Sequence, residues 1–245
     1  MKIAICGVSI GDKYNKKDWV KYALQNHKDY SNRHNYTYIL RNLPKTNRES
    51  TWEKIDLIKQ TIISNKYDYI FWMDTDSIFT NFTITIEDII NNTGEKYNFL
   101  FSGDTNIINA GHFIFKSCSW SLKELEKIWN IYPANYGMSG DNAALSVWLA
   151  GGNGNMTHNE QKKYYEKVDK GYIDSYEKYR IENGLAEEYI CEELNKYCKL
   201  IPKRKINSYK DDFQKGDFIF HAVNSGDNIR TTIFDYIKNN NIIVK

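Results

Sequence analysis

The chain has 245 residues, enough for one large or two small domains with a full hydrophobic core. Its 33 basic and 31 acidic residues give a formal net charge of +2. The electrostatic field of such a chain is too weak to make nucleic acid or a membrane surface its main partner. The 4 cysteines form no CxxC pair and are typical of a reducing compartment. We expect a cytoplasmic protein, because no segment reads as a signal peptide or as the roughly 20 apolar residues of a membrane span.

The N-terminal segments alternate between strand-like and helix-like patterns. KIAICGV (2–8) predicts a buried strand, residues 17–30 carry apolar side chains at helical spacing, and YTYILRN (36–42) alternates as a second strand. Many nucleotide-binding folds open with such a β-loop-α-β arrangement. STWEKIDLIKQTIIS (50–64) starts with capping-type residues and has one apolar face, which predicts a helix.

The stretch YDYIFWMDTDSIFTN (67–81) has the most informative pattern. Its continuous apolar run predicts a strand that is buried on both faces and ends at Asp74 and Asp76. In open α/β sheets, ligands bind at the C-terminal edge of the strands. Two carboxylates there repel each other unless a cation or a donor-rich ligand lies between them. We therefore expect a binding site at this point.

The remaining segments continue the alternation. NFLFSGD (98–104) and INAGHFIFK (108–116) predict strands, and residues 119–132 and 139–151 predict helices. A Lys-, Glu- and Tyr-rich stretch over 158–197 is interpreted as helical and solvated. KLIPKRKINSY (199–209), GDFIFHAV (216–223) and a final amphipathic segment return to an alternating pattern. We find no repeat and no linker, which favours a single domain.

Several of these blocks resemble, in their order, glycosyltransferase family 34, which includes fungal galactosyl- and mannosyltransferases and plant xyloglucan xylosyltransferases. The blocks are TWEKIDLIKQTI, DYIFWMDTDSIFTN, FSGDTNIINAGHFIFKSCSWS, SGDNAAL, IPKRKINSY and GDFIFHAV. The resemblance implies an α/β GT-A fold, which is Rossmann-like and has a mixed central sheet flanked by helices. We expect one domain over 1–245, with a nucleotide-binding half (1–80) and a sugar and acceptor half (81–245) that carries a helical insertion near 158–197.

The resemblance also implies a sugar-nucleotide donor, a divalent metal and transfer with retention of configuration. Asp74 and Asp76 are suitable oxygen ligands for a hard cation, which neutralises the diphosphate leaving group. By resemblance His221 is a third ligand, and an imidazole favours Mn²⁺ over the alternative Mg²⁺. A plain acidic turn and a core histidine are the structural alternatives. A haloacid dehalogenase-type phosphatase also uses Asp-x-Asp, but nearer the start of its domain.

Other residues are assigned to the donor phosphates. By resemblance Lys54 reaches the diphosphate; the alternative is a solvated helix lysine. The family has a second lysine shortly after its histidine, whereas this chain has HAVNSGDNIR (221–230). Arg230, or the backbone amides of Ser225 and Gly226, could replace that contact.

A last group is assigned to the sugar and the reaction. Asp104 and Asn109 are expected to hydrogen-bond hydroxyls of the donor sugar, and Gly111 lets a sugar approach the backbone. By resemblance Asp141 and Asn142 face the reacting carbon, although Asn142 stands where the family more usually has glutamine. Asp141 could instead only cap a helix.

We therefore expect a metal-dependent retaining hexosyl- or pentosyltransferase. Its donor would be a UDP-sugar, with GDP-mannose less favoured, and its acceptor a glycan. One alternative is a catalytically silent GT-A-fold protein that binds a glycan or an active partner subunit. Another is a glycogenin-like transferase, over which the SWS and INSY blocks favour family 34. The donor sugar, the acceptor and the oligomeric state stay open.

Overall fold

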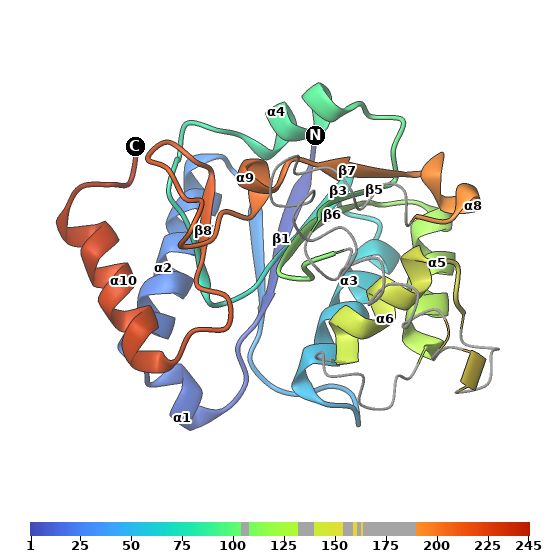
Figure 1. The fold of residues 1–245 in the computed structure, drawn as a ribbon, viewed down its shortest axis with the longest axis horizontal. Helices are drawn as coiled ribbons and strands as arrows, with labels where there is room; N and C mark the ends of the chain where they lie inside the picture. The colour runs from blue at the N-terminus through green and yellow to red at the C-terminus, as the bar shows by residue number, and fades with distance from the viewer. Residues whose placement is uncertain (104–107, 132–139, 154–158, 161–162, 164–189) are drawn as a thin grey trace.

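The computed structural model describes residues 1–103, 108–131, 140–153, 159–160, 163 and 190–245 (Figure 1). Asp104 and most of the expected insertion near 158–197 lie outside the described residues. Within the described part of that stretch, a short helix, α8, covers Glu192–Asn195. In the part of the chain that is described, no helix has the length and apolarity that a membrane crossing needs.

The core of the fold is a six-stranded mixed sheet in the order β2-β1-β3-β6-β5-β7. Its strands are β1 (Ile3–Val8), β2 (Thr37–Arg41), β3 (Tyr69–Met73), β5 (Phe99–Ser102), β6 (His112–Lys116) and β7 (Cys198–Ile201). β1 is parallel to β2 and β3, β6 is antiparallel to β3 and β5, and β5 is parallel to β7. The expected mixed sheet flanked by helices is confirmed.

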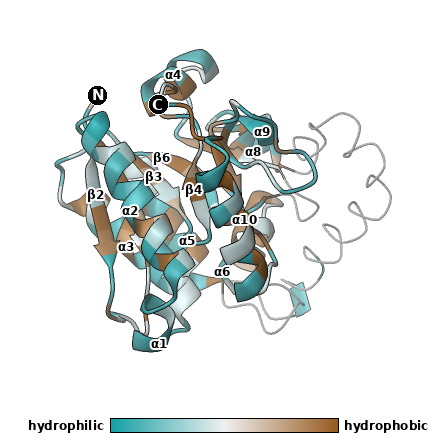
Figure 2. Ribbon diagram, turned by 90° about the vertical axis from the view of Figure 1, so that its left-hand side faces the viewer, coloured by the Kyte–Doolittle hydropathy of each residue, from teal (hydrophilic) through white to brown (hydrophobic). Residues whose placement is uncertain are grey.

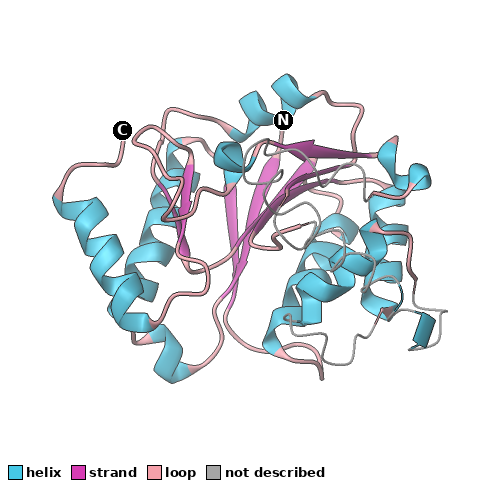
Figure 3. Cartoon of the chain, viewed as in Figure 1, coloured by secondary structure: helices cyan, strands magenta, loops and turns pink. Residues whose placement is uncertain are grey.

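Helices cover both faces of this sheet (Figures 1 and 3). They are α1 (Asp12–Asn15), α2 (Asp18–Arg33), α3 (Glu53–Ile63), α4 (Ile86–Thr93), α5 (Ser119–Asn130), α6 (Gly140–Leu149), α9 (Lys203–Ile206) and α10 (Asp227–Asn239), and a 3-10 turn, η1 (Ser50–Trp52), precedes α3. α3 packs on β1, β3 and α5, and α5 packs on α6. α2 and α10 pack on each other at the opposite side of the fold.

β3 is buried on both faces, as its continuous apolar run predicts. Ile70 and Trp72 join the apolar cluster shared with α3, α5 and α6. Tyr69, Phe71 and Met73 point the other way, into a second cluster that includes residues of α2 and α4. Successive strand residues alternate between faces, so one short strand supplies both halves of the core. Hydrophobic residues accordingly concentrate in the strands and the inner helix faces in Figure 2.

A second, two-stranded sheet was not predicted. β4 (Ser77–Phe79) pairs antiparallel with β8 (Ile219–His221), and Ser77 lies opposite His221. This pairing brings the C-terminal histidine beside the two aspartates that follow β3. The expected continuous alternation over 199–209 is wrong, because Pro202 ends β7 and a helical turn, α9, follows.

Candidate active site

The turn after β3 is fixed by contacts to two neighbouring strands. The Asp74 amide donates to the Gly111 carbonyl over 3.0 Å, just before β6. The Thr75 hydroxyl donates to the Val8 carbonyl over 2.7 Å, at the C-terminal end of β1. The carboxylates on either side of Thr75 therefore project from a rigid turn at the strand edge where the sequence predicted a site.

Three predicted ligands converge at this turn. Asp74, Asp76 and His221 each offer one ligand atom, and these atoms all lie within 4.8 Å of one another. His221 Nε2 is 3.2 Å from Asp76 Oδ1. Two carboxylate oxygens and one imidazole nitrogen form a donor set that suits Mn²⁺, with space in its coordination shell for other oxygen ligands. A divalent cation therefore fits these residues.

The two carboxylates have different surroundings. Asp76 accepts a hydrogen bond from Arg230 Nη2 over 2.7 Å. Burial by itself would raise the pKa of Asp76, but His221 and Arg230 together hold this pKa down at about 2. Burial raises the pKa of Asp74, and the charge of Asp76 adds to that effect. Asp76 is thus the more firmly ionised member of the pair.

Asp74 has its own donors. Its Oδ1 accepts a hydrogen bond from Trp72 Nε1 over 2.7 Å and lies 3.3 Å from Lys54 Nζ. Both contacts use Oδ1, which leaves Oδ2 for a cation. Trp72 belongs to the apolar run that predicts a buried strand, and it is buried, but its indole N–H also orients a predicted metal ligand.

Lys54 is buried rather than solvated, so its alternative reading as a solvated helix lysine is wrong. Only 5% of the residue is exposed. Its Nζ donates to the Ala110 carbonyl over 2.6 Å and to Asp141 Oδ2 over 2.7 Å. Burial disfavours the charge, but the carboxylates of Asp141 and Asp74 outweigh burial and raise the pKa of Lys54. A permanent positive charge therefore lies at this site.

Asp141 lies in the first turn of α6, and its two carboxylate oxygens have different surroundings. Oδ2 pairs with Lys54, whereas Oδ1 is buried and makes no hydrogen bond within the described structure. An ionised oxygen without a donor is costly in a folded protein. Asp141 therefore does more than cap a helix, and its Oδ1 is an acceptor available to a ligand.

The turn before β6 packs closely around the site. Asn142 Oδ1 accepts a hydrogen bond from the Ala110 amide, and Asn109 Oδ1 accepts one from the Gly111 amide, each over 2.8 Å. A Cβ added to Gly111 would lie 2.5 Å from Cε1 of His221. The glycine is therefore needed for the imidazole itself, a reason that the sequence pattern did not suggest.

Four of the predicted site residues line a cavity of about 310 Å³. Its lining includes Lys54, Asp74, Asp76 and Asp141, together with Val8, Ile10, Tyr14, Ser50, Thr51, Trp72 and Thr75. The lining combines charged groups with apolar side chains from the end of β1, which suits a ligand with an anionic part.

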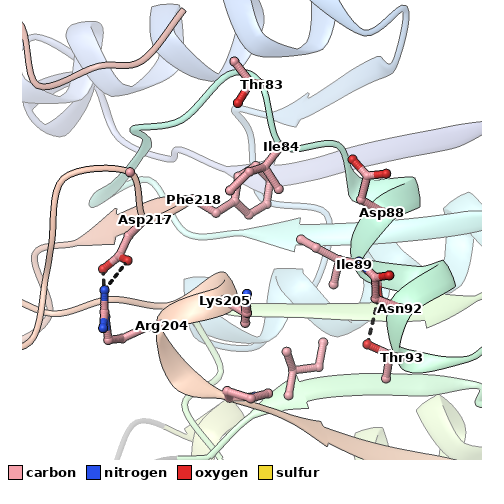
Figure 4. Close-up of a pocket in the computed structure, with 13 residues that line it drawn as sticks. Thr83, Ile84, Asp88, Ile89, Asn92, Thr93, Arg204, Lys205, Asp217 and Phe218 are labelled. Carbon is pink, nitrogen blue, oxygen red and sulfur yellow. Dashed lines mark hydrogen bonds and ion pairs between the residues drawn. The ribbon is translucent and has the colours of Figure 1, made fainter.

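A larger cavity of about 630 Å³ lies elsewhere (Figure 4). Its lining includes Asp217 and Phe218, which precede β8, whereas His221 ends that strand. Arg204 and Asp217 there pair with each other over 2.7 Å. Because this ion pair is already satisfied, the larger cavity is a weaker candidate than the one beside the aspartates.

Sequence reasoning missed Asn207. Its Oδ1 lies 2.8 Å from His221 Nδ1 and 2.9 Å from Nδ1 of His112, which is also buried. Asn207 is the asparagine of the INSY block, so a signal existed, but nothing local linked it to either histidine.

Comparisons with known proteins point to glycosyltransferases. Residues 2–93 match the model of the galactosyl transferase GMA12/MNN10 family. The chain is 28% identical over 133 residues to probable xyloglucan 6-xylosyltransferase 3 of Arabidopsis thaliana, and the alignment covers 49% of this chain and 27% of that protein. It is 25% identical over 218 residues to probable alpha-1,2-galactosyltransferase gmh2 of Schizosaccharomyces pombe, and this alignment covers 81% of this chain and 58% of that protein. The chain thus spans only about a quarter of the first relative's length.

Among solved structures, the chain is similar to a glycosyltransferase involved in the glycosylation of the major capsid of PBCV-1. The TM-score is 0.65 at 13% identity, covering 96% of this chain and 100% of that chain. At this identity the likeness concerns the fold alone, and it confirms the predicted GT-A fold.

Proposed function

As this chain belongs to glycosyltransferase family 34, we propose that it is a metal-dependent enzyme that transfers a sugar from a nucleotide-diphosphate donor to a hydroxyl acceptor with retention of configuration. The donor is a UDP-hexose or UDP-pentose and the acceptor a glycan. The convergence of Asp74, Asp76 and His221 beside the 310 Å³ cavity carries the proposal. The family match favours this reading over a glycogenin-like transferase.

Asp74, Asp76 and His221 would hold Mn²⁺, or Mg²⁺ as an alternative. The bound ion would act as a Lewis acid that neutralises charge on the departing diphosphate. Lys54 lines the same cavity and adds a positive charge, which its contacts with Asp74 and Asp141 hold in place. A pre-oriented ammonium costs little reorganisation when negative charge develops on the leaving group.

Arg230 takes the place of the family's second phosphate-binding lysine. It lies near the start of α10 and reaches Asp76 through Nη2. Its Nε is buried and has no hydrogen-bond partner within the described structure. A planar guanidinium with a spare donor can bind a phosphate oxygen while it keeps its contact with Asp76.

Asp141 and Asn142 act on the sugar. Oδ1 of Asp141, which has no partner among the described residues, accepts a hydrogen bond from a hydroxyl of the donor sugar, and Asn109 assists from the turn before β6. Asn142 is held by the Ala110 amide, so its dipole keeps a fixed direction near the reacting carbon. In a retaining transfer the acceptor attacks the face that the diphosphate leaves, and a fixed dipole on the opposite face stabilises the oxocarbenium-like state.

A screen of donor hydrolysis tests the proposal. Purified protein is incubated with UDP-xylose, UDP-galactose, UDP-glucose and GDP-mannose, each with and without Mn²⁺, and release of nucleotide is measured. We expect release from one or more UDP-sugars that requires Mn²⁺ and is lost in Asp76→Asn. Absence of release from every donor, with an acceptor-glycan mixture present, would contradict enzymatic function.

A catalytically silent glycan-binding or partner subunit is the second candidate, favoured by one observation. Both aspartates already contact cationic side chains, Lys54 at Asp74 and Arg230 at Asp76. In a silent protein these contacts would replace the metal permanently. Calorimetric titration with Mn²⁺ in the presence of UDP separates the two: the enzyme binds the metal, and the silent protein does not.

A further inference from the structure

Asn207 joins two buried histidines through one oxygen. Its Oδ1 lies 2.8 Å from Nδ1 of His221 and 2.9 Å from Nδ1 of His112. On its other side, Nδ2 donates to Ser102 Oγ over 3.1 Å. Asn207, His112 and Ser102 are each 0% exposed, so these contacts are shielded from bulk solvent.

The chemistry of the amide sets the proton positions on the rings. A carbonyl oxygen only accepts hydrogen bonds, and its two lone pairs serve the two histidines. With Oδ1 placed between the rings, each Nδ1 carries a proton. The Nε2 atom of His221 is then the nitrogen that faces Asp76, at 3.2 Å from Oδ1 of that carboxylate.

We propose that Asn207 is a positioning residue that keeps the proton of His221 on Nδ1 and presents the Nε2 lone pair to a divalent cation held with Asp74 and Asp76. This inference rests on the proposed metal-dependent function. A histidine that binds a metal through one nitrogen generally donates a hydrogen bond from the other, and that bond fixes both the tautomer and the ring orientation. Here a neutral amide, rather than a carboxylate, performs this role.

The position of Asn207 in the chain explains why it can do so. It follows α9 directly, and the neighbouring Ser208 carbonyl accepts a hydrogen bond from the His221 amide over 2.8 Å. The segment after α9 thus holds both the backbone and the ring of His221. With the backbone amide and ring Nδ1 of His221 both held, the imidazole keeps one orientation, and Nε2 stays directed toward Asp76.

Three variants separate the hydrogen bond from general packing. Asn207→Leu has a similar volume and lacks the acceptor, whereas Asn207→Asp retains an accepting oxygen. Ser208→Ala is the matched control, because Ser208 is adjacent and equally buried and its side chain bonds Asp217 rather than His221. Thermal unfolding confirms that each variant is folded before it is compared.

Mn²⁺ affinity is measured by calorimetry, and imidazole ligation by the ¹⁴N modulation in pulsed EPR of bound Mn²⁺. We expect Asn207→Leu to weaken Mn²⁺ by about 10- to 100-fold and to lose the ¹⁴N signature. Asn207→Asp and Ser208→Ala should keep both. Wild-type affinity and signature in Asn207→Leu, or equal losses in the Asp and Leu variants, would overturn the proposal.

A metal-free measurement distinguishes failure of this inference from failure of the proposed function. ¹H–¹⁵N NMR of the imidazoles reports which ring nitrogens of His221 carry a proton. We expect a proton on Nδ1 in the wild type and its loss in Asn207→Leu; without a metal, Nε2 can also carry a proton, which it donates to Asp76 and gives up when the cation binds. If the wild type has the Nδ1 proton but binds no Mn²⁺, control of that proton by Asn207 holds and the metal-dependent function fails. A wild-type ring with its proton on Nε2 alone overturns the inference itself.

Discussion

Lys54 Nζ lies 2.7 Å from Oδ2 of Asp141, although 87 positions separate the two residues. The pair joins the start of α3 to the start of α6 across the candidate cavity. Because Lys54 also contacts Asp74, one buried ammonium links the metal-binding turn to the residues assigned to the sugar. The charge balance of the site therefore depends on this lysine.

Replacing Lys54 by methionine should destabilise the fold. Removing one member of a buried ion pair leaves an uncompensated charge and costs about 3–5 kcal/mol. Lys59→Met, in the same helix, removes only the more exposed pair with Glu126 and should cost about 0–1 kcal/mol. Urea unfolding measures both. Adding Asp141→Asn to Lys54→Met should recover part of the loss, and equal costs in the two lysine variants would contradict the buried pair.

Asp74→Asn and Asp76→Asn should each reduce Mn²⁺ affinity by at least about 10-fold, because each removes one anionic ligand from the cation. Each substitution also removes the ionic partner of a cationic side chain, Lys54 at Asp74 and Arg230 at Asp76, so thermal unfolding is used to show that each variant is folded at the temperature of the titration. Calorimetry with Mn²⁺ makes the measurement. Asp18→Asn is the control, since that side chain is 88% exposed and lies on α2. Unchanged affinity in both site variants would remove the metal assignment.

Arg230→Met should weaken UDP binding by about 10-fold, because the guanidinium offers charge-assisted donors to a phosphate oxygen. Arg230→Lys should restore part of the affinity, since a lysine supplies the charge without the planar fork. Lys238→Met lies in the same helix and should bind UDP as the wild type does. Titration calorimetry gives all three values. If Arg230→Met matches the control, the backbone amides of Ser225 and Gly226 are the better candidates.

Asn142→Ala should lower turnover by roughly 100- to 1000-fold with little change in donor affinity, because a fixed dipole acts mainly on the transition state. The product formed first from an α-linked donor should be an α-glycoside, as NMR of the fresh reaction would show. A β-glycoside would mean that the transfer inverts the configuration, with a carboxylate such as Asp141 acting as base.

The fold should become less stable as the pH is lowered, because His27 is fully buried. Burial lowers the pKa of His27 to about 4, although the hydrogen bond from Nε2 to the Ser77 carbonyl offsets part of the effect. The unfolded chain therefore binds this proton first as pH falls, and folding loses stability between about pH 6.5 and pH 4. At about 1.4 kcal/mol per pKa unit, the loss over this window is about 3 kcal/mol.

His27→Gln should remove this contribution, because glutamine does not titrate. Urea unfolding at pH 7 and at pH 4 measures the change in the free energy of unfolding for each protein. The wild type should lose about 3 kcal/mol more than the variant between these two values. The same loss in both would mean that His27 does not titrate differently in the folded and unfolded chains.

Local patterns were sufficient for most of the elements. The continuous apolar run ending at Met73 predicts a strand buried on both faces, and the structure confirms it. The apolar face of residues 50–64 likewise predicts the helix found as η1 and α3. Asp74 and Asp76 are placed at a strand tip by their position in the sequence. Such predictions succeed because side-chain periodicity within one segment reports which faces are buried.

Local patterns failed where an element is short. β4 is only 3 residues long, Ser77–Phe79, and follows the aspartates without a distinct pattern of its own. Its pairing with β8 places Ser77 opposite His221. So short a run has no readable period, and its strand conformation depends on a partner that lies far along the chain.

The sequence by itself determined the order of the elements, the strand tip that carries two carboxylates and, through resemblance, the residues to examine. Only the tertiary structure decided that Lys54 bridges Asp74 and Asp141, and that Asn207 holds His221 by its Nδ1. These contacts join segments that are distant in sequence. A pattern along one segment specifies which face is buried, but the partner on that face is chosen by packing and register in the complete fold.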